Sequence, residues 1–152
     1  MNAKSATWTY YDGRWQEGDV RILGAASHAT WLGSLVFDGA RLFEGVTPDL
    51  DLHAARINDS ARALGLEPTL SAGDIEALTR EGLKKFSPGT DVYIRPMYWA
   101  EESDAGTVPP LASSTAFALC LEAIPMAAPT GFTVTTTSFR RPTLEVMPVN
   151  AK

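Results

Sequence analysis

The fold of this chain is decided by residues 92–99, VYIRPMYW, whose β-branched and aromatic side chains are typical of a β-strand. Side chains alternate between the faces of a strand, so we expect Tyr93 and Arg95 to share one face. Val92 and Ile94 then point to the other face. A tyrosine hydroxyl beside a guanidinium makes a good binding surface for a carboxylate. The alternative is that Arg95 pairs with a structural acid on a solvated face of the sheet.

Pro96 follows this pair of side chains and lacks the N–H that a strand donates to its neighbour. It therefore predicts that residues 92–99 form an edge strand or end irregularly. Two further strand-like stretches follow, at residues 115–124 and 131–139. A polar loop containing glycine and proline, residues 101–114, joins the first two strands. The second half of the chain is thus predicted to be mainly β-structure.

Two helices are predicted upstream of these strands. In the first, apolar residues recur every three or four positions, which is the spacing of one buried helix face. They are Leu50, Ala54, Ile57, Ala61 and Leu64. Gly65 and Pro68 end this helix. The second helix begins at Ser71, where Asp74 occupies the last position of a capping box, and it stops at residues 87–89.

Two Asp-Gly pairs predict turns in the first part of the chain. Asp12-Gly13 lies between aromatic runs at residues 8–11 and 14–16, which is the pattern of a β-hairpin. Asp38-Gly39 ends the short apolar run at residues 35–37, and residues 41–43 are its expected partner. A glycine here also allows close approach of the backbone to a ligand, but a turn is the favoured interpretation.

The order of strands, two helices and strands again, without regular βαβ alternation, predicts one α+β domain over residues 1–152: a small sheet with two helices packed on it. With 152 residues, 45% of them hydrophobic, the chain can bury a real core. A net charge of −5 without basic runs argues against nucleic-acid binding. The longest apolar stretches are far below the ~20 residues of a membrane helix. The single cysteine, Cys120, excludes a disulfide framework and a cysteine-rich metal site, and it favours the cytoplasm.

Arg56 is the first candidate ligand for an anion. It lies three residues after His53 and four before Ser60, so these side chains share one helix face beside the apolar stripe. That position lets Arg56 reach inward. A guanidinium suits a phosphate because it donates several hydrogen bonds and keeps its charge. The alternative is a surface arginine on a solvated helix face.

In this order, the motifs resemble those of the fold-type IV pyridoxal-phosphate aminotransferases of the branched-chain type. The matching residues are Ser27-His28, Phe37-Asp38-Gly39 with Arg41, His53 and Arg56 as His-x-x-Arg, Tyr93 to Pro96 as Tyr-x-Arg-Pro, and lastly Arg141, Pro148 and Lys152. The resemblance covers nearly the whole chain.

This resemblance implies a transaminase that uses pyridoxal 5'-phosphate to move an amino group between an amino acid and a 2-oxo acid. The expected amino acid is branched-chain or otherwise apolar, in the L series. Lys152 would form the Schiff base with the cofactor, and Arg56 would bind its phosphate. Tyr93 and Arg95 would hold a substrate carboxylate, and Phe37 would line the side-chain pocket. The chain would be the N-terminal part of a larger two-domain enzyme that forms a cytoplasmic homodimer.

Two alternatives stay open. Within the same fold, the chain can belong to a D-amino-acid transaminase, an (R)-amine transaminase or an aminodeoxychorismate lyase. Residues 31–33 are Trp-Leu-Gly, where branched-chain enzymes often carry a tyrosine that helps to recognise the side-chain carboxylate of glutamate. From another class, a non-catalytic α+β binding domain would use Arg56 and Arg95 as surface charges and give Lys152 no role.

Overall fold

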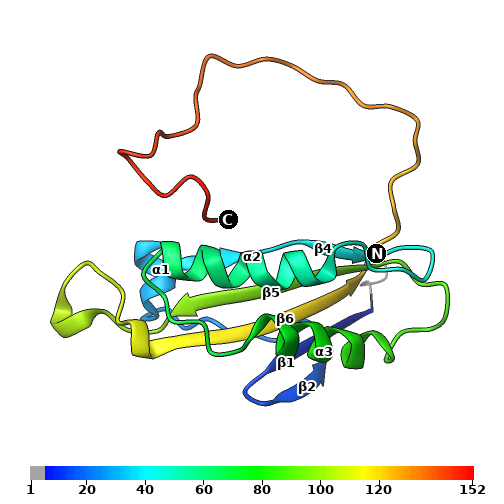
Figure 1. Cartoon of the computed structure of the whole chain (residues 1–152), viewed down its shortest axis with the longest axis horizontal. Coiled ribbons are helices and arrows are strands. Elements are labelled where there is room, and N and C mark those ends of the chain that lie inside the picture. Colours follow the sequence, from blue (N-terminus) through cyan, green and yellow to red (C-terminus); the bar gives the residue numbers. More distant parts are fainter. Residues whose placement is uncertain (1–5) are drawn as a thin grey trace.

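The computed structural model describes residues 6–152, apart from the side chain of residue 105 (Figure 1). Within these residues it contains a six-stranded sheet with the order β2-β1-β6-β5-β3, in which β4 also pairs with β5. The strands are β1 (Thr7–Tyr11), β2 (Arg14–Glu17), β3 (Leu35–Phe37), β4 (Ala40–Leu42), β5 (Val92–Ala100) and β6 (Thr115–Ala123). The helices are α1 (His28–Leu32), α2 (Leu50–Ala63) and α3 (Ala72–Leu83), with short 3-10 turns η1 (Asp104–Gly106) and η2 (Ala112–Ser114). The predicted α+β fold is confirmed.

The hairpin predicted at Asp12-Gly13 is confirmed by β1 and β2. Both turn residues have positive φ, 53° for Asp12 and 73° for Gly13, as the tight turns of two-residue hairpins require. β1 also pairs with β6, and β6 pairs with β5 along its whole length, in both cases antiparallel. The two long strands predicted in the second half of the chain therefore form the middle of the sheet.

The hairpin predicted at Asp38-Gly39 is wrong. β3 and β4 do not pair with each other, because both pair with β5: β3 lies opposite residues 97–99 and β4 opposite residues 92–94. The backbone N–H of Asp38 donates to the carbonyl oxygen of Pro96, so the chain continues along β5 and does not reverse. β3 and β4 are thus two segments of one interrupted strand, with Asp38-Gly39 as the interruption.

The predicted edge position of residues 92–99 is also wrong, since β5 lies between β6 on one side and β3 and β4 on the other. Pro96 sits opposite the interruption at Asp38-Gly39. In an antiparallel pair, the N–H and C=O of one residue face the same neighbour. The missing N–H of Pro96 therefore falls where the neighbouring ladder is already broken, so a proline costs little there.

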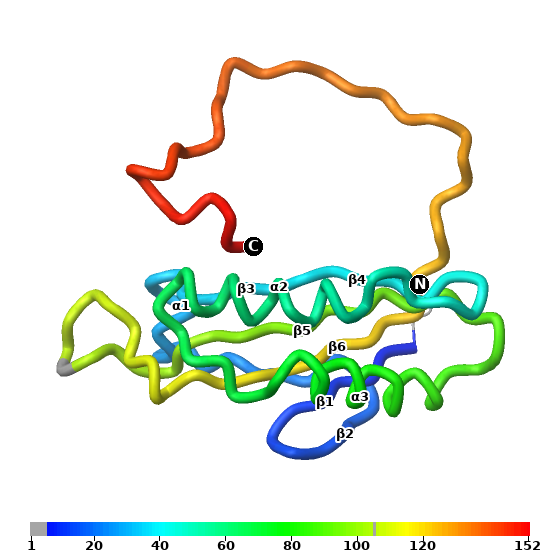
Figure 2. The backbone as a smooth tube through the Cα atoms, in the orientation of Figure 1, coloured from blue at the N-terminus to red at the C-terminus, as the bar shows by residue number. Residues whose placement is uncertain are grey.

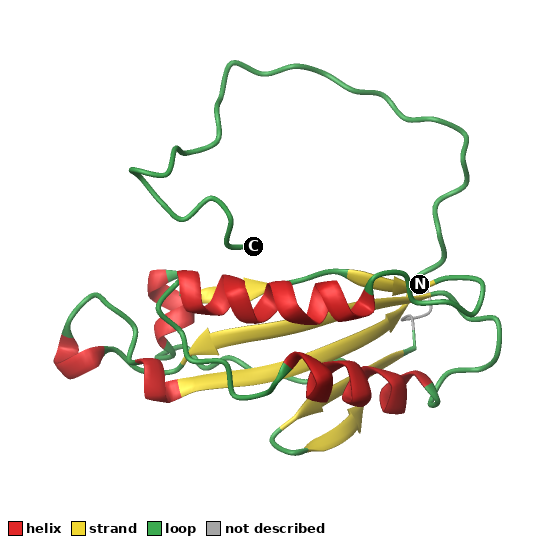
Figure 3. Cartoon of the chain, viewed as in Figure 1, coloured by secondary structure: helices red, strands yellow, loops and turns green. Residues whose placement is uncertain are grey.

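α2 and α3 cover one face of the sheet (Figure 3). The predicted apolar stripe of α2 is buried from Leu50 to Ala61. Its residues Ala54, Ile57 and Ala61 pack with Val36 and Tyr98 of the sheet. α3 begins with the predicted capping box between Ser71 and Asp74. None of the described helices combines the length and the apolar composition needed to cross a bilayer.

The opposite face of the sheet is only partly covered. At one end, Ala29 of α1 packs on Trp99 and Ala118. Farther along the same face, the side chains of Phe37, Tyr93 and Arg95 keep partial contact with solvent. This uncovered part of the face holds the pocket of the candidate site.

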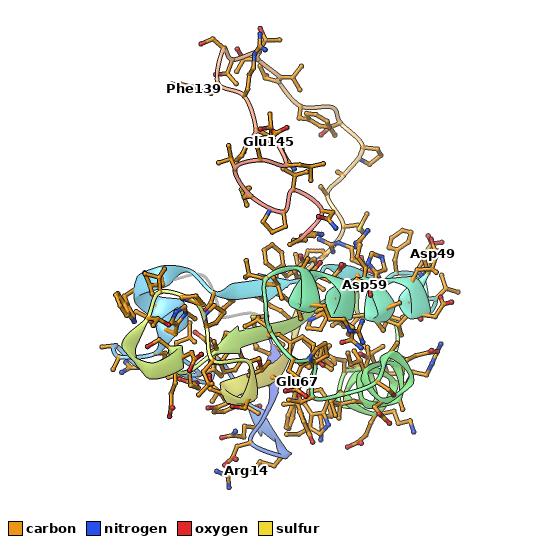
Figure 4. All side chains as sticks on the ribbon, turned by 60° about the vertical axis from the view of Figure 1, so that its left-hand side comes forward. Arg14, Asp49, Asp59, Glu67, Phe139 and Glu145 are labelled. Atoms are coloured by element: carbon orange, nitrogen blue, oxygen red, sulfur yellow. The ribbon has the colours of Figure 1, made fainter. Side chains whose placement is uncertain are left out.

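After β6 the chain forms a long loop that swings away from the sheet and returns to it (Figure 2). The strand predicted at residues 131–139 is wrong for this structure: Phe132, Val134 and Phe139 are between 77% and 90% exposed, and no described strand pairs with them. A strand needs a neighbour for its backbone hydrogen bonds and a surface for its apolar face, and this segment has neither. Figure 4 shows Phe139 and Glu145 on the part of the loop that extends from the helices and the sheet.

Candidate active site

The centre of the site is the carboxylate of Asp38, which is fully buried at the interruption between β3 and β4. Arg56 donates to it from Nε to Oδ2 at 2.6 Å and from Nη2 to Oδ1 at 2.8 Å. His53 Nδ1 lies 2.8 Å from Oδ1, and the backbone N–H of Gly39 donates to Oδ1 at 2.6 Å. We call Asp38, His53 and Arg56 the Asp38 cluster.

The helix explains how the Asp38 cluster forms. His53 and Arg56 are three residues apart on α2, so both side chains reach the same point on the sheet edge. Burial alone would raise the pKa of Asp38, but hydrogen bonds from Arg56, His53 and the Gly39 N–H outweigh it and leave that pKa below its ordinary value. The hydrogen bonds to Asp38 raise the pKa of Arg56 in turn. Asp38 and Arg56 therefore both stay charged at neutral pH.

Arg56 still has donors to offer. Its side chain is 50% exposed, and Nη1 makes no hydrogen bond with any described residue. The Asp38 carboxylate accepts hydrogen bonds from Nε and Nη2, on one edge of the planar guanidinium, and these two bonds set its orientation. The other edge faces outward as a positively charged, preoriented surface for an anion.

Lys152 returns to the same sheet edge. Its carbonyl oxygen accepts a hydrogen bond from the N–H of Phe37 at 2.8 Å, and its own N–H donates to the buried Ser60 hydroxyl at 3.2 Å. Its ammonium nitrogen lies 5.6 Å from the centre of the Phe37 ring. Phe37 is the neighbour of Asp38, so the lysine is attached directly beside the Asp38 cluster.

The uncovered face of the sheet holds a shallow pocket of about 340 Å³. Its lining comes from β3 and β5 and consists of Leu35, Phe37, Tyr93, Arg95 and Met97. The alternation of side chains thus correctly placed Tyr93 and Arg95 on one face, with Val92 and Ile94 in the core on the other. The structure brings the three residues predicted to contact substrate into one pocket.

Arg95 is both a pocket residue and half of an ion pair. Its Nη2 donates to Oε2 of Glu122 on β6 at 3.1 Å, and its guanidinium carbon lies 5.4 Å from the centre of the Tyr93 ring. Arg95 therefore pairs with an acidic residue of the sheet, as the alternative interpretation of the sequence stated, and it also lines the pocket. Gly39 is needed for this arrangement, because a Cβ at that position would collide with the Tyr93 hydroxyl.

Ser27 and His28 do not join this site. Ser27 bonds to Glu101, and His28 places its ring nitrogens 2.7 Å from the Ser34 hydroxyl and 2.9 Å from the Val108 carbonyl oxygen. The contacts to Glu101 and Val108 join the start of α1 to the loop that follows β5.

Sequence reasoning missed two residues of the site. Asp38 was assigned to a turn, and Glu122 was seen only as part of a strand. The signal for Asp38 was the pair His53 and Arg56, which need a carboxylate partner if they turn inward. The signal for Glu122 was its place in an otherwise apolar strand, on the same face as Cys120.

A model of the family Amino-transferase class IV matches residues 35–151, which is the region from β3 to the last loop. The chain belongs to the class IV aminotransferases. The match includes Arg56, Tyr93 and Arg95, so the family resemblance drawn from the motifs is confirmed.

Several curated aminotransferases are similar to this chain. A probable branched-chain-amino-acid aminotransferase of Rickettsia bellii is 25% identical over 99% of the chain and 52% of its own length. The branched-chain-amino-acid aminotransferase of Escherichia coli K12 is 27% identical over 76% of the chain and 38% of its own length. The chain thus spans about half the length, or less, of these curated relatives.

Solved structures agree with the fold. An aminotransferase from Brucella abortus, bound to the cofactor PLP, is 86% identical with a TM-score of 0.94, over 97% of this chain and 52% of that one. The E. coli branched-chain amino acid aminotransferase superposes with a TM-score of 0.76 at 23% identity, over 99% of this chain and 50% of that one. At 23% identity, the comparison with the E. coli structure shows only that the two proteins share a fold.

Proposed function

We propose that this chain is the first part of a two-domain, pyridoxal-phosphate-dependent aminotransferase that moves an amino group between an amino acid and a 2-oxo acid. Its membership of the class IV family supports this activity. So does its 86% identity to the Brucella abortus aminotransferase, whose structure contains PLP. The proposal of a second domain rests on the chain spanning about half the length of these relatives.

The observation that carries this proposal is the position of Lys152. Its carbonyl oxygen accepts a hydrogen bond from the N–H of Phe37 on β3, and its N–H donates to the Ser60 hydroxyl on α2. Asp38, the next residue along that edge, orients the guanidinium of Arg56. A primary amine and a preoriented cation on one sheet edge are the two groups that an aldehyde bearing a phosphate requires.

The residues on this edge fit pyridoxal phosphate. When bound, the cofactor supplies the electron sink for reaction at the substrate's α-carbon. Arg56 would bind the phosphate through the N–H groups that Asp38 leaves unused. Lys152 would hold the cofactor covalently through its side-chain amine, and the same amine, when free, would carry the proton at the substrate's α-carbon.

The pocket beside Phe37 would receive the substrate. Tyr93 and Arg95 would hold a substrate carboxylate as one unit, and Leu35, Phe37 and Met97 offer an apolar wall to the side chain. An apolar wall favours a branched-chain or other apolar side chain. The names of the Rickettsia bellii and E. coli relatives support the same substrate class.

We also propose that the enzyme is a cytoplasmic homodimer whose other partners are its small-molecule substrates. The single cysteine, Cys120, lies partly buried in β6, and burial raises the pKa of its thiol. An unreactive lone thiol needs no oxidising compartment.

The test is to follow the cofactor on the enzyme that contains this chain. Added pyridoxal phosphate should produce an absorption band near visible wavelengths, borohydride should remove the band, and peptide mapping should then find the cofactor on Lys152. The Lys152→Ala variant should show neither the band nor transamination. Turnover of this variant at the wild-type rate, or a label on another lysine, contradicts the proposal.

A substrate panel then separates the members of the family. We expect transamination of L-leucine and little or none of D-alanine or an (R)-amine. Preference for D-alanine or for the amine would contradict the branched-chain assignment while leaving the role of Lys152 intact.

A further inference from the structure

Ser60 is a buried polar residue to which the proposed mechanism gives no role. It lies within α2 and is 2% exposed. Serine is less favourable than alanine in a helix interior, because its hydroxyl competes with the backbone for hydrogen bonds. A buried serine hydroxyl inside a helix therefore requires a hydrogen-bond partner. Here the partner comes from far along the chain, since the N–H of Lys152 donates to Oγ at 3.2 Å.

A second buried hydroxyl shows the ordinary arrangement within a helix. Thr79 of α3 is fully buried, and its hydroxyl donates to the carbonyl oxygen of Ile75 at 2.7 Å. That bond stays within one turn of α3. The Ser60 hydroxyl differs because it accepts a hydrogen bond from a residue 92 positions later. Ser60 thus joins α2 to the loop that follows β6, whose far end lies beside α2 in Figure 1.

The backbone of Lys152 is held on both sides of its Cα. Its N–H bonds to Ser60, and its carbonyl oxygen accepts from the N–H of Phe37 at 2.8 Å. The preceding residue, Ala151, packs against the core cluster that includes Ile57 of α2. Because peptide groups are planar, bonding both the N–H and the C=O of one residue restricts its φ and ψ. The direction in which the lysine side chain leaves the backbone is restricted with them.

Ser60 also lies one helical turn from Arg56, the proposed phosphate ligand. Residues four apart are neighbours on one helix face, with Cβ atoms about 5–6 Å apart. The aldehyde and the phosphate-bearing methylene of pyridoxal phosphate lie on neighbouring carbons of one ring. The amine and the phosphate ligand must therefore be held at a short, fixed separation. A single rigid helix can set that separation when it holds Arg56 and the backbone of Lys152 one turn apart.

We propose that Ser60 is a positioning residue for Lys152: its hydroxyl fixes the lysine backbone on α2 and so directs the side-chain amine toward the cofactor's aldehyde carbon. This inference rests on the proposed function, because it assumes that Lys152 binds the cofactor covalently. Ser60 acts through the lysine backbone and needs no contact of its own with cofactor or substrate. Removing its hydroxyl should leave the phosphate site intact and loosen the amine.

The experiment compares two cofactor forms on the enzyme that contains this chain. Pyridoxal phosphate and pyridoxamine phosphate share the ring and the phosphate, but only pyridoxal phosphate has an aldehyde to which the lysine amine can attach. We expect Ser60→Ala to weaken the binding of pyridoxal phosphate about fivefold relative to pyridoxamine phosphate in fluorescence titrations, the scale of one hydrogen bond. Alanine favours the helix, so the variant should fold.

Two variants control this comparison. Thr79→Val removes a buried hydroxyl from α3 and should leave the ratio of the two affinities unchanged. Ser60→Cys keeps a weak acceptor at the same place, so its ratio should lie between those of the wild type and Ser60→Ala.

Hydrogen exchange of the cofactor-free enzyme, measured by mass spectrometry, gives a readout that needs no cofactor. The N–H of Lys152 loses its acceptor in Ser60→Ala and keeps it in Thr79→Val. The peptide that contains Lys152 should therefore exchange faster in Ser60→Ala than in Thr79→Val or the wild type.

The outcomes separate this inference from the proposed function. An unchanged affinity ratio in Ser60→Ala, an equal loss for both compounds, or unchanged exchange at Lys152 overturns the positioning role of Ser60. If the wild-type enzyme binds both compounds but borohydride attaches no cofactor to Lys152, the proposed function fails, and the inference that rests on it fails with it.

Discussion

Replacing Asp38 with asparagine tests whether the Asp38 cluster joins α2 to the sheet edge. The carboxylate is fully buried and accepts two hydrogen bonds from Arg56 and one from the Gly39 N–H, with His53 Nδ1 at 2.8 Å. Asparagine keeps the shape but loses the charge, and its amide N–H groups face donors. Breaking a fully buried pair costs about 3–5 kcal/mol. Arg56 is half exposed and can turn to water, so we expect a loss of about 2 kcal/mol in the free energy of unfolding.

The dependence on pH sharpens this prediction. The pKa of Asp38 in the folded protein is lowered from its ordinary value of 3.8, because the hydrogen bonds outweigh burial. A lowered folded-state pKa gives stability that is fully present above the unfolded-state pKa and is lost as the pH falls through the folded-state pKa. The advantage of the wild type over Asp38→Asn should therefore be constant near neutral pH and shrink below a pH of about 4.

Urea denaturation of both proteins between pH 3 and pH 7 measures this difference. Asp59→Asn is the matched control, because Asp59 pairs with Arg62 on the exposed surface of the same helix. It should change the unfolding midpoint little at any pH. An Asp38→Asn protein as stable as the wild type at neutral pH, or a difference that does not shrink in acid, refutes the argument.

Three further predictions concern the ligand sites. Arg56→Ala should weaken the binding of pyridoxal phosphate by a few kcal/mol and leave the binding of pyridoxal, which lacks the phosphate, nearly unchanged. Equal losses of affinity in titrations of the two compounds would contradict a phosphate-binding role for Arg56. Arg95→Lys keeps the charge but loses the planar fork, so kcat/KM for amino acids should fall strongly, and less for simple amines. Tyr93→Phe should also lower kcat/KM for amino acids, and the double variant should lose less than the sum of the two single losses, expressed as free energies. If neither single variant changes kcat/KM, this strand has only a structural role. Gly39→Ala should displace the Tyr93 ring through its hydroxyl contact and mimic Tyr93→Phe in the same assay, and unchanged kinetics would show that the ring has room to move.

Local patterns predicted most of the elements that position the site. The apolar spacing of α2, the capping box of α3 and the Asp12-Gly13 turn depend on interactions within a few residues, and all three are present. The alternation along β5 likewise placed Tyr93 and Arg95 on one face. These features depend on the local geometry of a helix, strand or turn, so the sequence of each segment is enough to predict them.

The errors concern partners that are distant in sequence. Pro96 indicated an edge because a proline removes one ladder bond, but the interruption of the neighbouring strand absorbs that loss. The segment at residues 131–139 has strand composition and stays a loop, since no described strand offers it backbone partners. In both cases the sequence of the segment itself is compatible with two outcomes, and the neighbouring strand decides between them.

Asp38 shows how such an ambiguity can be resolved by chemistry. Asp-Gly favours a turn when only the local backbone is considered, because both residues tolerate positive φ. His53 and Arg56 favour the other outcome. An arginine beside an apolar stripe turns inward only where a carboxylate can pair with it. The buried carboxylate of Asp38 is tolerated in turn because His53 and Arg56 contact it with their side-chain nitrogens. The helix and the interrupted strand therefore specify each other. The ion pair between Asp38 and Arg56 lies next to Phe37, whose backbone N–H donates to the carbonyl oxygen of Lys152. The contact that accounts for the interrupted strand therefore also lies where Arg56 and Lys152, the proposed cofactor-binding residues, meet the sheet edge.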